Sequence, residues 1–568
     1  MIKRIKIGTG SCGIAAGADE VLKLFQDNVK DIDIVEVGCK GHCYAEPMVE
    51  VETDNGSIIY EHVKADKADL DNILNLGEKS RFTLRKQRSE REMIRVTRLA
   101  GKINPVSFEE YVENGGYKAL KKALGMDPAD IVEEVKKSGL RGRGGAGFPT
   151  GLKWSFMAGK TAEKKILVCN ADEGDPGAFM DRSLMESVPH QVLEGMLIAA
   201  YAVGATQIFI YCRAEYPLAI KNLSIAQKQA EENGLTNFDG RSISIRIKEG
   251  AGAFVCGEET ALIHSLEGYR GTPRFRPPFP TDSGFKGYPT MINNVETFGN
   301  IPMIIADGAS AYASVGTKGS TGTKLFALAG DLECPGLAEV PIGITIADIV
   351  YGIGGAKEGS VKAVQIGGPS GGCIPADLFD TPIDYDSLKS LGAIMGSGGL
   401  IVIGNRCMVE TARYFLDFTA RESCGKCTFC RIGTTRMLET MEKITGGHGT
   451  EEDIDFLEDI GEKIIKGSLC ALGQTAPNPV LATLKYFRNE YEMHVRDKQC
   501  PALECPALVD VEIDKENCIE CKLCIKTCPV NAIDEEYIVD NEKCTRCNSC
   551  IEVCSKNAIS RVPKGGAK

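Results

Sequence analysis

Two cysteine runs near the end of the sequence have the spacing of iron–sulfur cluster ligands. CIECKLCIKTC, from residue 518, and CTRCNSCIEVC, from residue 544, both follow C-x2-C-x2-C-x3-C. In such a pair, three thiolates of one run and the last thiolate of the other hold each [4Fe–4S] cluster. One predicted cluster has the ligands Cys518, Cys521, Cys524 and Cys554. The other has Cys544, Cys547, Cys550 and Cys528, and zinc is the alternative metal for both sets.

A third set of cysteines needs a distant ligand to be complete. ESCGKCTFC supplies Cys424, Cys427 and Cys430, and no fourth cysteine follows closely. Cys470, at the start of an apolar helical stretch, is the candidate. The set predicts a third [4Fe–4S] cluster, with zinc as the alternative. Electron transfer is the activity that three clusters on one chain would serve.

Between this third set and the two runs stands a further group of metal-binding residue types. His494, Cys500 and Cys505 have H-x5-C-x4-C spacing, which fits a structural zinc ion with its fourth ligand unidentified. The alternative is a linker with unligated cysteines. The isolated cysteines, which are predicted to be buried in the core, are Cys212, Cys334, Cys373 and Cys407.

A glycine-rich stretch earlier in the chain, GLRGRGGAGFPTGLKW at 139–154, contains G-x-G-x-x-G. It follows the helix-like DIVEEVKKSG, whereas a dinucleotide fingerprint follows a strand and opens a helix. Glycine still lets backbone N–H groups approach phosphate, and Arg143 and Lys153 supply charge. The stretch predicts an anion-binding loop, with a flexible turn as the alternative.

Two more stretches follow predicted strands and are acidic. They are CNADEGDPGAFMDR at 169–182 and GAGAFVCGEETAL at 250–262. Acidic side chains beside a phosphate loop suit ribose hydroxyls and ring nitrogens. The polar residues concerned are Asn170, Asp172, Glu173, Asp175, Glu258 and Glu259.

The elements that must position these residues predict a multidomain protein of α/β and α+β parts. The 568 residues are too many for one core. Residues 1–90 read as β-α-β-β, and 91–314 alternate helices and strands around a largely parallel sheet. The remaining predicted parts are a compact α+β module at 315–405, a helical bundle at 406–510 and the repeated cysteine domain at 511–568.

Composition excludes several classes of protein. The net charge is −12, from 66 basic and 78 acidic residues, which argues against nucleic-acid binding. The longest apolar run, residues 196–205, is about half the length of a membrane span, and the N-terminus lacks a signal-peptide pattern. We therefore expect a cytoplasmic protein, in which the high count of 23 cysteines is explained by metal binding, chiefly by the twelve of the three close-spaced sets, rather than by disulfides.

Several of these motifs occur together in one known family. The glycine-rich stretch, the two acidic stretches, RFRPPFP at 274–280, PTMINNVET at 289–297 and the Cys424–Cys470 segments resemble the NADH- and FMN-binding subunit of respiratory complex I and its soluble relatives. The resemblance covers about residues 110–490. It implies a non-standard Rossmann-like fold, followed by a ubiquitin-like SLBB module, in which FMN lies deep and NADH stacks above it.

The resemblance also implies roles for residues, position by position. The FMN contacts would be Gly142, Arg143, Gly144, Lys153, Asn170, Asp172, Glu173, Phe254, Gly257, Glu258, Asn293 and Asn294. The contacts to the nicotinamide nucleotide would be Phe148, Phe156, Asp175, Glu259 and Phe279.

Three positions depart from the family pattern. The family commonly has Glu at Asp175, Lys at Arg276 and Tyr at Phe254. Asp175 and Arg276 would lie near the dinucleotide, where a shorter acid and a guanidinium favour a 2′-phosphate. NAD is the expected nucleotide, and NADP stays open.

The N-terminal part has a resemblance of its own. Cys12 and VGCKGHC at 37–43 are similar to the thioredoxin-like [2Fe–2S] domain of complex I's small flavoprotein partner, whose pattern is C-x4-C then C-x3-C. Gly17 stands where the second cysteine would be, which leaves Cys12, Cys39 and Cys43. A [2Fe–2S] cluster with an unconventional fourth ligand and no cluster at all are both open.

The order of thioredoxin-like head, flavin module and two-cluster ferredoxin tail resembles the β subunit of multimeric, including electron-bifurcating, NAD-dependent [FeFe] hydrogenases. This implies hydride exchange between NAD(H) and FMN, then one-electron transfer through the clusters. Implied partners are a hydrogenase catalytic subunit, a small thioredoxin-like [2Fe–2S] subunit and ferredoxin, in a hetero-oligomer. Alternatives are a diaphorase subunit of an NAD(P)-dependent formate dehydrogenase, a stand-alone NADH:ferredoxin oxidoreductase, and a scaffold that has lost its flavin.

Overall fold

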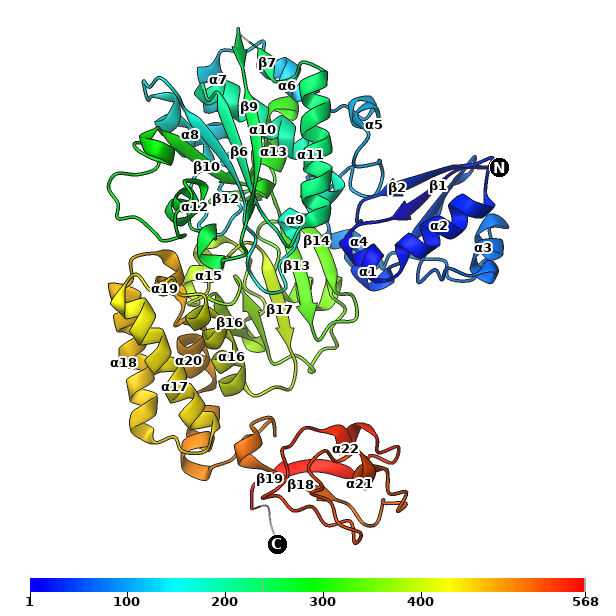
Figure 1. Ribbon diagram of the computed structural model, residues 1–568, viewed down its shortest axis with the longest axis vertical. Coiled ribbons are helices and arrows are strands. Elements are labelled where there is room, and N and C mark those ends of the chain that lie inside the picture. Colours follow the sequence, from blue (N-terminus) through cyan, green and yellow to red (C-terminus); the bar gives the residue numbers. More distant parts are fainter. Residues whose placement is uncertain (239, 566–568) are drawn as a thin grey trace. The chain divides into compact units, whose positions relative to one another are not determined.

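The computed structural model describes residues 1–238 and 240–565. It divides into two compact units, 1–404 and 405–568, which are drawn from blue to red along the chain in Figure 1. Each unit is described by itself below. Within the described residues, no helix is both long enough and apolar enough to cross a membrane.

The first unit begins with a four-stranded mixed sheet in the order β2-β1-β3-β4. β1 pairs in parallel with β2 and antiparallel with β3, and Ile5 and Ile7 of β1 are fully buried. The predicted strand–helix–strand–strand order is present here. The bounds are β1 Ile2–Gly8, α2 Ala18–Asn28, β2 Asp33–Val37, β3 Val49–Thr53 and β4 Gly56–Tyr60.

A second sheet, in the order β10-β5-β6-β9, is entirely parallel, as the alternation of predicted strands and helices indicated. Helices cover it, and nearly every residue of α10 is buried, which accounts for the long apolar run. The strands are β5 Ile166–Ala171, β6 Gln207–Arg213, β9 Ser244–Gly250 and β10 Thr290–Asn294. The helices around them include α7 Pro128–Lys137, α8 Thr150–Ala158, α9 Met180–Ser187, α10 Pro189–Val203, α11 Pro217–Glu232, α12 Glu259–Leu266 and α13 Val295–Asp307.

A third sheet, of five strands in the order β14-β13-β17-β15-β16, completes the first unit. β13 pairs in parallel with β17, and the other neighbours are antiparallel. Its strands are β13 Thr323–Gly330, β14 Gly336–Pro341, β15 Ala363–Ile366, β16 Gly372–Pro375 and β17 Gly399–Ile403. Its separate apolar core includes Phe326, Val340 and Ile349.

The second unit contains the predicted helical bundle and the repeated cysteine segment. The bundle buries Leu416, Met441 and Leu457 along the apolar faces of its helices. Its long helices are α16 Met408–Arg421, α17 Thr434–Thr445, α18 Glu451–Gly467 and α20 Asn478–Glu492. The cysteine runs lie between two antiparallel strands, β18 Val509–Ile513 and β19 Ile559–Pro563, with the short helices α21 Leu523–Thr527 and α22 Ser549–Glu552.

Candidate cofactor sites

The predicted nucleotide residues gather where β5 and β10 end. The two strands are parallel neighbours, so that Asn294 pairs with Asn170 in the register. Ligands of open α/β sheets bind beyond the carboxyl ends of such strands. The side-chain amide of Asn170 donates to the carbonyl of Gly257 at 2.9 Å, which brings the second acidic stretch to the same edge.

The glycine-rich loop runs from helix α7 to helix α8, so it is not the strand-to-helix turn of a Rossmann fold. The Gly142 N–H donates to the Phe148 carbonyl at 2.9 Å, which closes the loop. A Cβ at Gly144 would lie 3.0 Å from the Cβ of Asn294, so the loop passes directly against the end of β10. Glycine permits this close approach.

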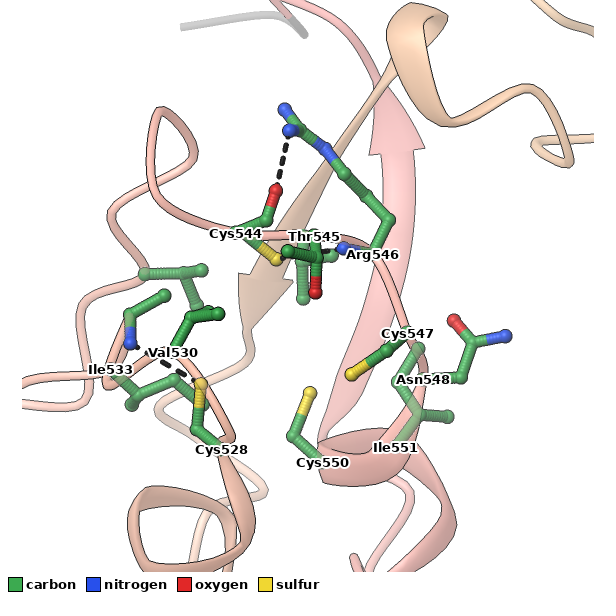
Figure 2. A pocket seen from close by; sticks show the side chains of 13 residues that line it. Cys528, Val530, Ile533, Cys544, Thr545, Arg546, Cys547, Asn548, Cys550 and Ile551 are labelled. Atoms are coloured by element: carbon green, nitrogen blue, oxygen red, sulfur yellow. Dashed lines mark hydrogen bonds between the residues drawn. The ribbon is translucent and has the colours of Figure 1, made fainter.

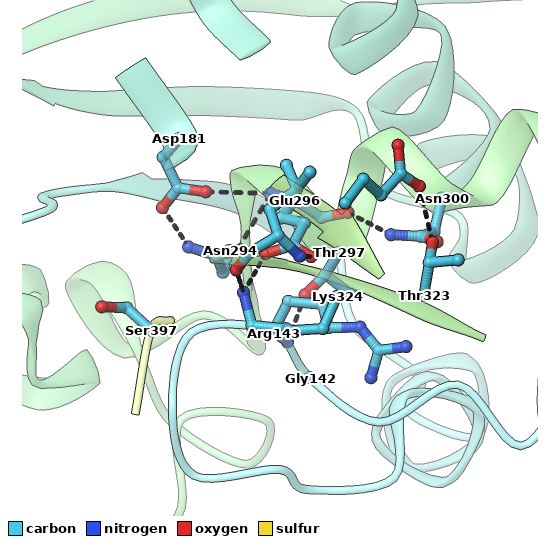
Figure 3. A network of polar contacts seen from close by, with 12 residues as sticks. Gly142, Arg143, Asp181, Asn294, Glu296, Thr297, Asn300, Thr323, Lys324 and Ser397 are labelled. Carbon is cyan, nitrogen blue, oxygen red and sulfur yellow. Dashed lines mark hydrogen bonds and ion pairs between the residues drawn. The ribbon is translucent and has the colours of Figure 1, made fainter. Parts of the chain in front are cut away.

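The side chain of Arg143 has a different role from the predicted phosphate contact. It is fully buried, and its Nη2 donates to the Tyr312 hydroxyl at 3.0 Å and to the Thr321 carbonyl at 2.7 Å. Its backbone N–H donates to Thr297 Oγ1 (Figure 3). The loop lies at the sheet edge, where the predicted nucleotide residues gather, but glycine spacing does not reveal which way a side chain points. In this structure Arg143 anchors the loop.

Charged side chains at the sheet edge form ion pairs with one another. Lys153 Nζ lies 3.3 Å from Glu259 Oε2 and donates to the Ile292 carbonyl at 3.1 Å. Arg276 pairs with Glu259 at 3.0 Å and also with Glu258, whose carboxylate caps the start of α12. Cations and carboxylates are thus both available to phosphate, ribose and ring atoms.

Three aromatic side chains predicted to meet the nicotinamide nucleotide are exposed. Phe148, Phe156 and Phe279 have exposed fractions of 43%, 48% and 51%. Large apolar side chains that remain exposed mark a ligand or partner site when they gather, and aromatic rings suit stacking. Phe254, in the second acidic stretch, packs against the first, since a Cβ at Gly174 would be 2.6 Å from its ring.

Asp175 is a half-buried acidic residue between the second and third sheets. The Ser397 hydroxyl donates to its Oδ2 at 2.6 Å, and a Cβ at Gly368 would approach its Oδ1 to 2.5 Å. Burial raises the pKa of Asp175 to about 6, and the Ser397 hydrogen bond opposes that shift. Glu173 nearby accepts from the backbone N–H groups of Asp181 and Arg182 at 3.1 Å.

The cysteine runs of the C-terminal segment line two cavities. One is lined by Cys528, Cys544, Cys547 and Cys550, whose sulfurs point toward one another (Figure 2). The other is lined by Cys518, Cys521, Cys524 and Cys554. Each cavity therefore has three thiols from one run and one from the other, and its remaining lining is largely apolar. Four converging thiols in such a pocket fit a [4Fe–4S] cluster.

The bundle cysteines also converge. Cys430 is buried beside Gly473, where a Cβ would lie 3.0 Å from its own, and Ser423 Oγ lies 3.1 Å from its Sγ. Burial, together with the neighbouring thiols of Cys427, Cys470 and Cys424, raises the pKa of Cys430 to about 11, against the hydrogen bond with Ser423. The Cys470 thiol therefore lies near the Cys430 thiol, as a fourth cluster ligand must.

The three N-terminal cysteines lie close to one another. Cys39 and Cys43 have their sulfurs 4.0 Å apart, and Arg182 Nη2 lies 3.8 Å from the sulfur of Cys12. A hydrogen bond from Cys43 and the charge of Arg182 lower the pKa of Cys12 to about 7, against the effect of burial. Gly17 has a φ of 99°, and in the described part of the chain nothing lies within 4 Å of its absent Cβ.

A compact metal-binding group lies in the second unit, and sequence reasoning found three of its four members. Cys407, His494, Cys500 and Cys505 are all buried, with their ligand atoms within 4.8 Å of one another. The Cys407 and Cys505 sulfurs are 3.7 Å apart, close to the ~3.8 Å expected of tetrahedral zinc with Zn–S bonds of about 2.3 Å.

The surroundings of this group also fit a metal. His494 Nδ1 is 2.7 Å from the Glu490 carbonyl, which leaves Nε2 facing the thiols. The prediction that Cys407 is buried in the core is confirmed, but the sequence did not relate it to the other three members of the group. It precedes α16, 87 residues before His494, and only the fold brings the two together. The sole sequence signal was a cysteine placed directly before an amphipathic helix.

The sheet edge and the converging cysteines define the class as iron–sulfur flavoproteins among the NAD(P)H-dependent oxidoreductases. Residues 135–303 match the Nuo51 FMN-binding domain, and 410–494 match the NADH-ubiquinone oxidoreductase-F iron-sulfur binding region. Residues 511–534 and 537–560 each match the 4Fe-4S binding domain. The chain belongs to the family of the FMN-binding 51 kDa subunit of complex I, as its motifs had indicated.

Several relatives are similar over most of their length. The NADP-reducing hydrogenase subunit HndC of Solidesulfovibrio fructosivorans is 52% identical over 453 residues, 78% of this chain and 92% of the relative. An NADH-quinone oxidoreductase subunit of Rhizobium meliloti is 44% identical over 399 residues, 69% of this chain and 95% of the relative. A crystal structure of an NAD+-reducing [NiFe]-hydrogenase in the H2-reduced state superposes with a TM-score of 0.64 at 31% identity, covering 87% of this chain and 84% of that one.

Proposed function

We propose that this subunit exchanges a hydride between NAD(H) and FMN and passes electrons singly through three [4Fe–4S] clusters, within an electron-bifurcating [FeFe] hydrogenase that uses ferredoxin as its second carrier. The observation that carries the proposal is the pair of four-cysteine cavities beyond the flavin-binding region. They offer a one-electron route in addition to the bundle cysteines. A relative of 52% identity that is named a hydrogenase subunit supports the choice of complex.

The residues at the sheet edge have positioning roles in this proposal. When bound, FMN supplies the chemistry that links a two-electron donor to one-electron acceptors. Phe148, Phe156 and Phe279 stack against the nucleotide and exclude water from the hydride path. Lys153 exchanges part of its pairing with Glu259 for phosphate. No protein side chain has to transfer a proton for hydride transfer itself.

Nucleotide choice is proposed to favour NAD(H). Arg276 is paired with Glu258 and Glu259, so its guanidinium is not committed to a 2′-phosphate. Asp175, when ionised, repels that phosphate. The NADP-reducing relative keeps NADP(H) as the alternative.

Two further metal sites belong to the proposal. Zinc held by Cys407, His494, Cys500 and Cys505 stabilises the junction between the bundle and the cysteine runs. A [2Fe–2S] cluster at Cys12, Cys39 and Cys43 is supported by the closeness of the Cys39 and Cys43 sulfurs and by Arg182 beside Cys12, since thiolates are the ligands of such clusters.

The test is to purify the tagged chain anaerobically from its own cells, identify the subunits that come with it, and measure whether ferredoxin turnover is obligatory for NAD(H) turnover. A hydrogenase catalytic subunit, a small thioredoxin-like [2Fe–2S] subunit and tight coupling to ferredoxin are expected. A formate dehydrogenase catalytic subunit, or a chain that reduces ferredoxin alone, would replace the hydrogenase assignment.

A further inference from the structure

The two cysteine runs of the C-terminal segment differ in charge at one equivalent position. The second residue after the first cysteine is Glu520 in one run and Arg546 in the other. Both have positive φ, 54° and 56°, and the backbone N–H of each lies 3.4 Å from the sulfur of that cysteine, Cys518 or Cys544. The backbone at the two positions is therefore alike, and the side-chain charge is inverted.

Arg546 is held in place beside its cavity. Its Nη1 donates to the Cys544 carbonyl at 2.6 Å and its Nε to the Val509 carbonyl at 3.2 Å, and only 16% of its side chain is exposed. Arg546 is one of the residues that line the cavity of Cys528, Cys544, Cys547 and Cys550 (Figure 2). A cation fixed in a partly buried position is screened less than one in solvent.

Other charged residues near the two cavities are expected to affect the clusters less than Arg546 does. Asp510 lies 3.4 Å from Arg546 and offsets part of its field. Lys556 lines the opposite cavity, that of the Cys518 set, but its side chain is exposed, as is that of Glu520. The fixed, partly buried Arg546 is therefore expected to produce the largest difference between the two sites.

We propose that Arg546 makes the cluster held by Cys528, Cys544, Cys547 and Cys550 the first of the two to accept an electron, with Glu520 acting in the opposite sense on the other. Reduction adds one negative charge to a cluster, and a nearby cation stabilises that charge while an anion destabilises it. The inference rests on the proposed presence of [4Fe–4S] clusters in both cavities.

A second arginine, Arg561, connects the loop of Arg546 to the rest of the second unit. Arg561 Nη2 donates to the Arg546 carbonyl at 2.8 Å, and its Nη1 donates to the Leu503 carbonyl at 3.0 Å. Leu503 lies between Cys500 and Cys505. The electron would therefore settle on the cluster whose loop is attached to the proposed zinc segment.

The test is an EPR-monitored redox titration of the intact complex, carried out on wild type and four single variants. Arg546→Gln is expected to lower the reduced-to-oxidised ratio of the Cys528 cluster about tenfold at a given potential, a shift of ~59 mV for one electron. Arg546→Lys keeps the charge and is expected to stay near wild type. Glu520→Gln is expected to raise the potential of the cluster held by the Cys518 set. Lys556→Gln, the exposed control, is expected to change the potential of that cluster less than Arg546→Gln changes the potential of the Cys528 cluster.

Separate Cys547→Ser and Cys521→Ser variants, which alter one cluster each, assign the EPR signals. The inference is overturned if the Cys518 cluster is reduced first in wild type, or if Arg546→Gln moves neither cluster or both equally. If the Arg546→Gln variant loses its cluster, Glu520→Gln decides instead. A raised potential of the Cys518 cluster supports the inference, and a lowered or unchanged potential overturns it. Absence of iron from this segment, measured by iron content before any titration, would instead overturn the cluster assignment on which the inference rests.

Discussion

At the scale of single residues, Cys407 shows how a proposed metal ligand can escape prediction from the sequence. Its thiol is 3.4 Å from His494 Nε2 and 3.7 Å from Cys505 Sγ. His494, Cys500 and Cys505 could be predicted because they are close in the chain. Cys407 could not, because its proximity to them exists only once α16 and α20 have packed together.

Replacing Cys407 with serine is expected to remove the proposed zinc and destabilise the second unit by about 4 kcal/mol or more, since loss of a structural metal is among the largest single-residue effects. Zinc per chain, measured by mass spectrometry of metals, and the thermal unfolding of the complex check this. Cys334→Ser, at an equally buried cysteine outside the group, is the control and should retain zinc. Full zinc content in Cys407→Ser would contradict the assignment.

Asp175 gives a prediction about pH and nucleotide choice. Its raised pKa of about 6 means that the folded protein holds a proton there which an unfolded chain, with a pKa near 3.8, releases. Its contribution to stability therefore falls as pH rises from about 4 to about 6. Glu173 and Arg213 face it as well, the first raising and the second lowering its pKa.

As the pH falls through 6, Asp175 becomes neutral and no longer repels a 2′-phosphate. The ratio of kcat/KM for NADPH to that for NADH is expected to rise several-fold between pH 7.5 and 5.5. The 2′-phosphate of NADPH titrates in the same pH range. Asp175→Asn is therefore the control that separates its titration from that of Asp175. That variant should have a higher and flatter ratio, and a ratio that depends on pH as in wild type would count against the role of Asp175.

At the scale of elements, the link between the second and third sheets is a buried ion pair. Lys324 of β13 pairs with Glu296 at the start of α13, and both side chains are 1% exposed or less. Glu296 also accepts from the Leu325 N–H at 3.0 Å, and Asp181 of α9 accepts from the Glu296 N–H at 3.1 Å (Figure 3). The pair thereby fixes the end of β10, where Asn293 and Asn294 lie.

Lys324→Met is expected to destabilise the first unit by about 3–5 kcal/mol, because it leaves the Glu296 carboxylate buried without its partner. Denaturant unfolding followed by fluorescence of Trp154, the single tryptophan, reports on this unit. Lys228→Met, which breaks an exposed pair with Glu232, should change stability by no more than about 0.5 kcal/mol. Equal effects of the two substitutions would contradict the role of the buried pair.

Some features of the elements could be predicted from the sequence, and others could not. The alternation of helical and strand patterns along the chain predicted the parallel sheet, since parallel neighbours are usually joined by helices. The helix α7 before the glycine-rich loop was likewise predicted, whereas α8 after it was not. The direction of Arg143 was not, because it depends on Tyr312 and Thr321, which lie more than 160 residues away.

At the scale of the whole molecule, the cysteine sets occupy separate parts of the chain, and each depends on contacts of a different range. The crossed pairing of the two C-terminal runs follows from their spacing alone. The Cys424–Cys470 set requires α17 and α18 to pack against each other, which returns the chain to the first three cysteines. The N-terminal cysteines meet Arg182, a residue of the flavin-binding part, which no spacing rule relates to Cys12.

The measurement that tests the central claim most directly is an anaerobic NADH titration of the purified complex, following flavin absorbance and cluster EPR signals together. The account predicts one FMN and about fourteen cluster irons for this chain, four for each four-cysteine set and two for the N-terminal set, with flavin bleaching accompanied by EPR signals of reduced clusters. Flavin that NADH leaves oxidised, or protein without flavin and iron even after anaerobic reconstitution, would contradict it.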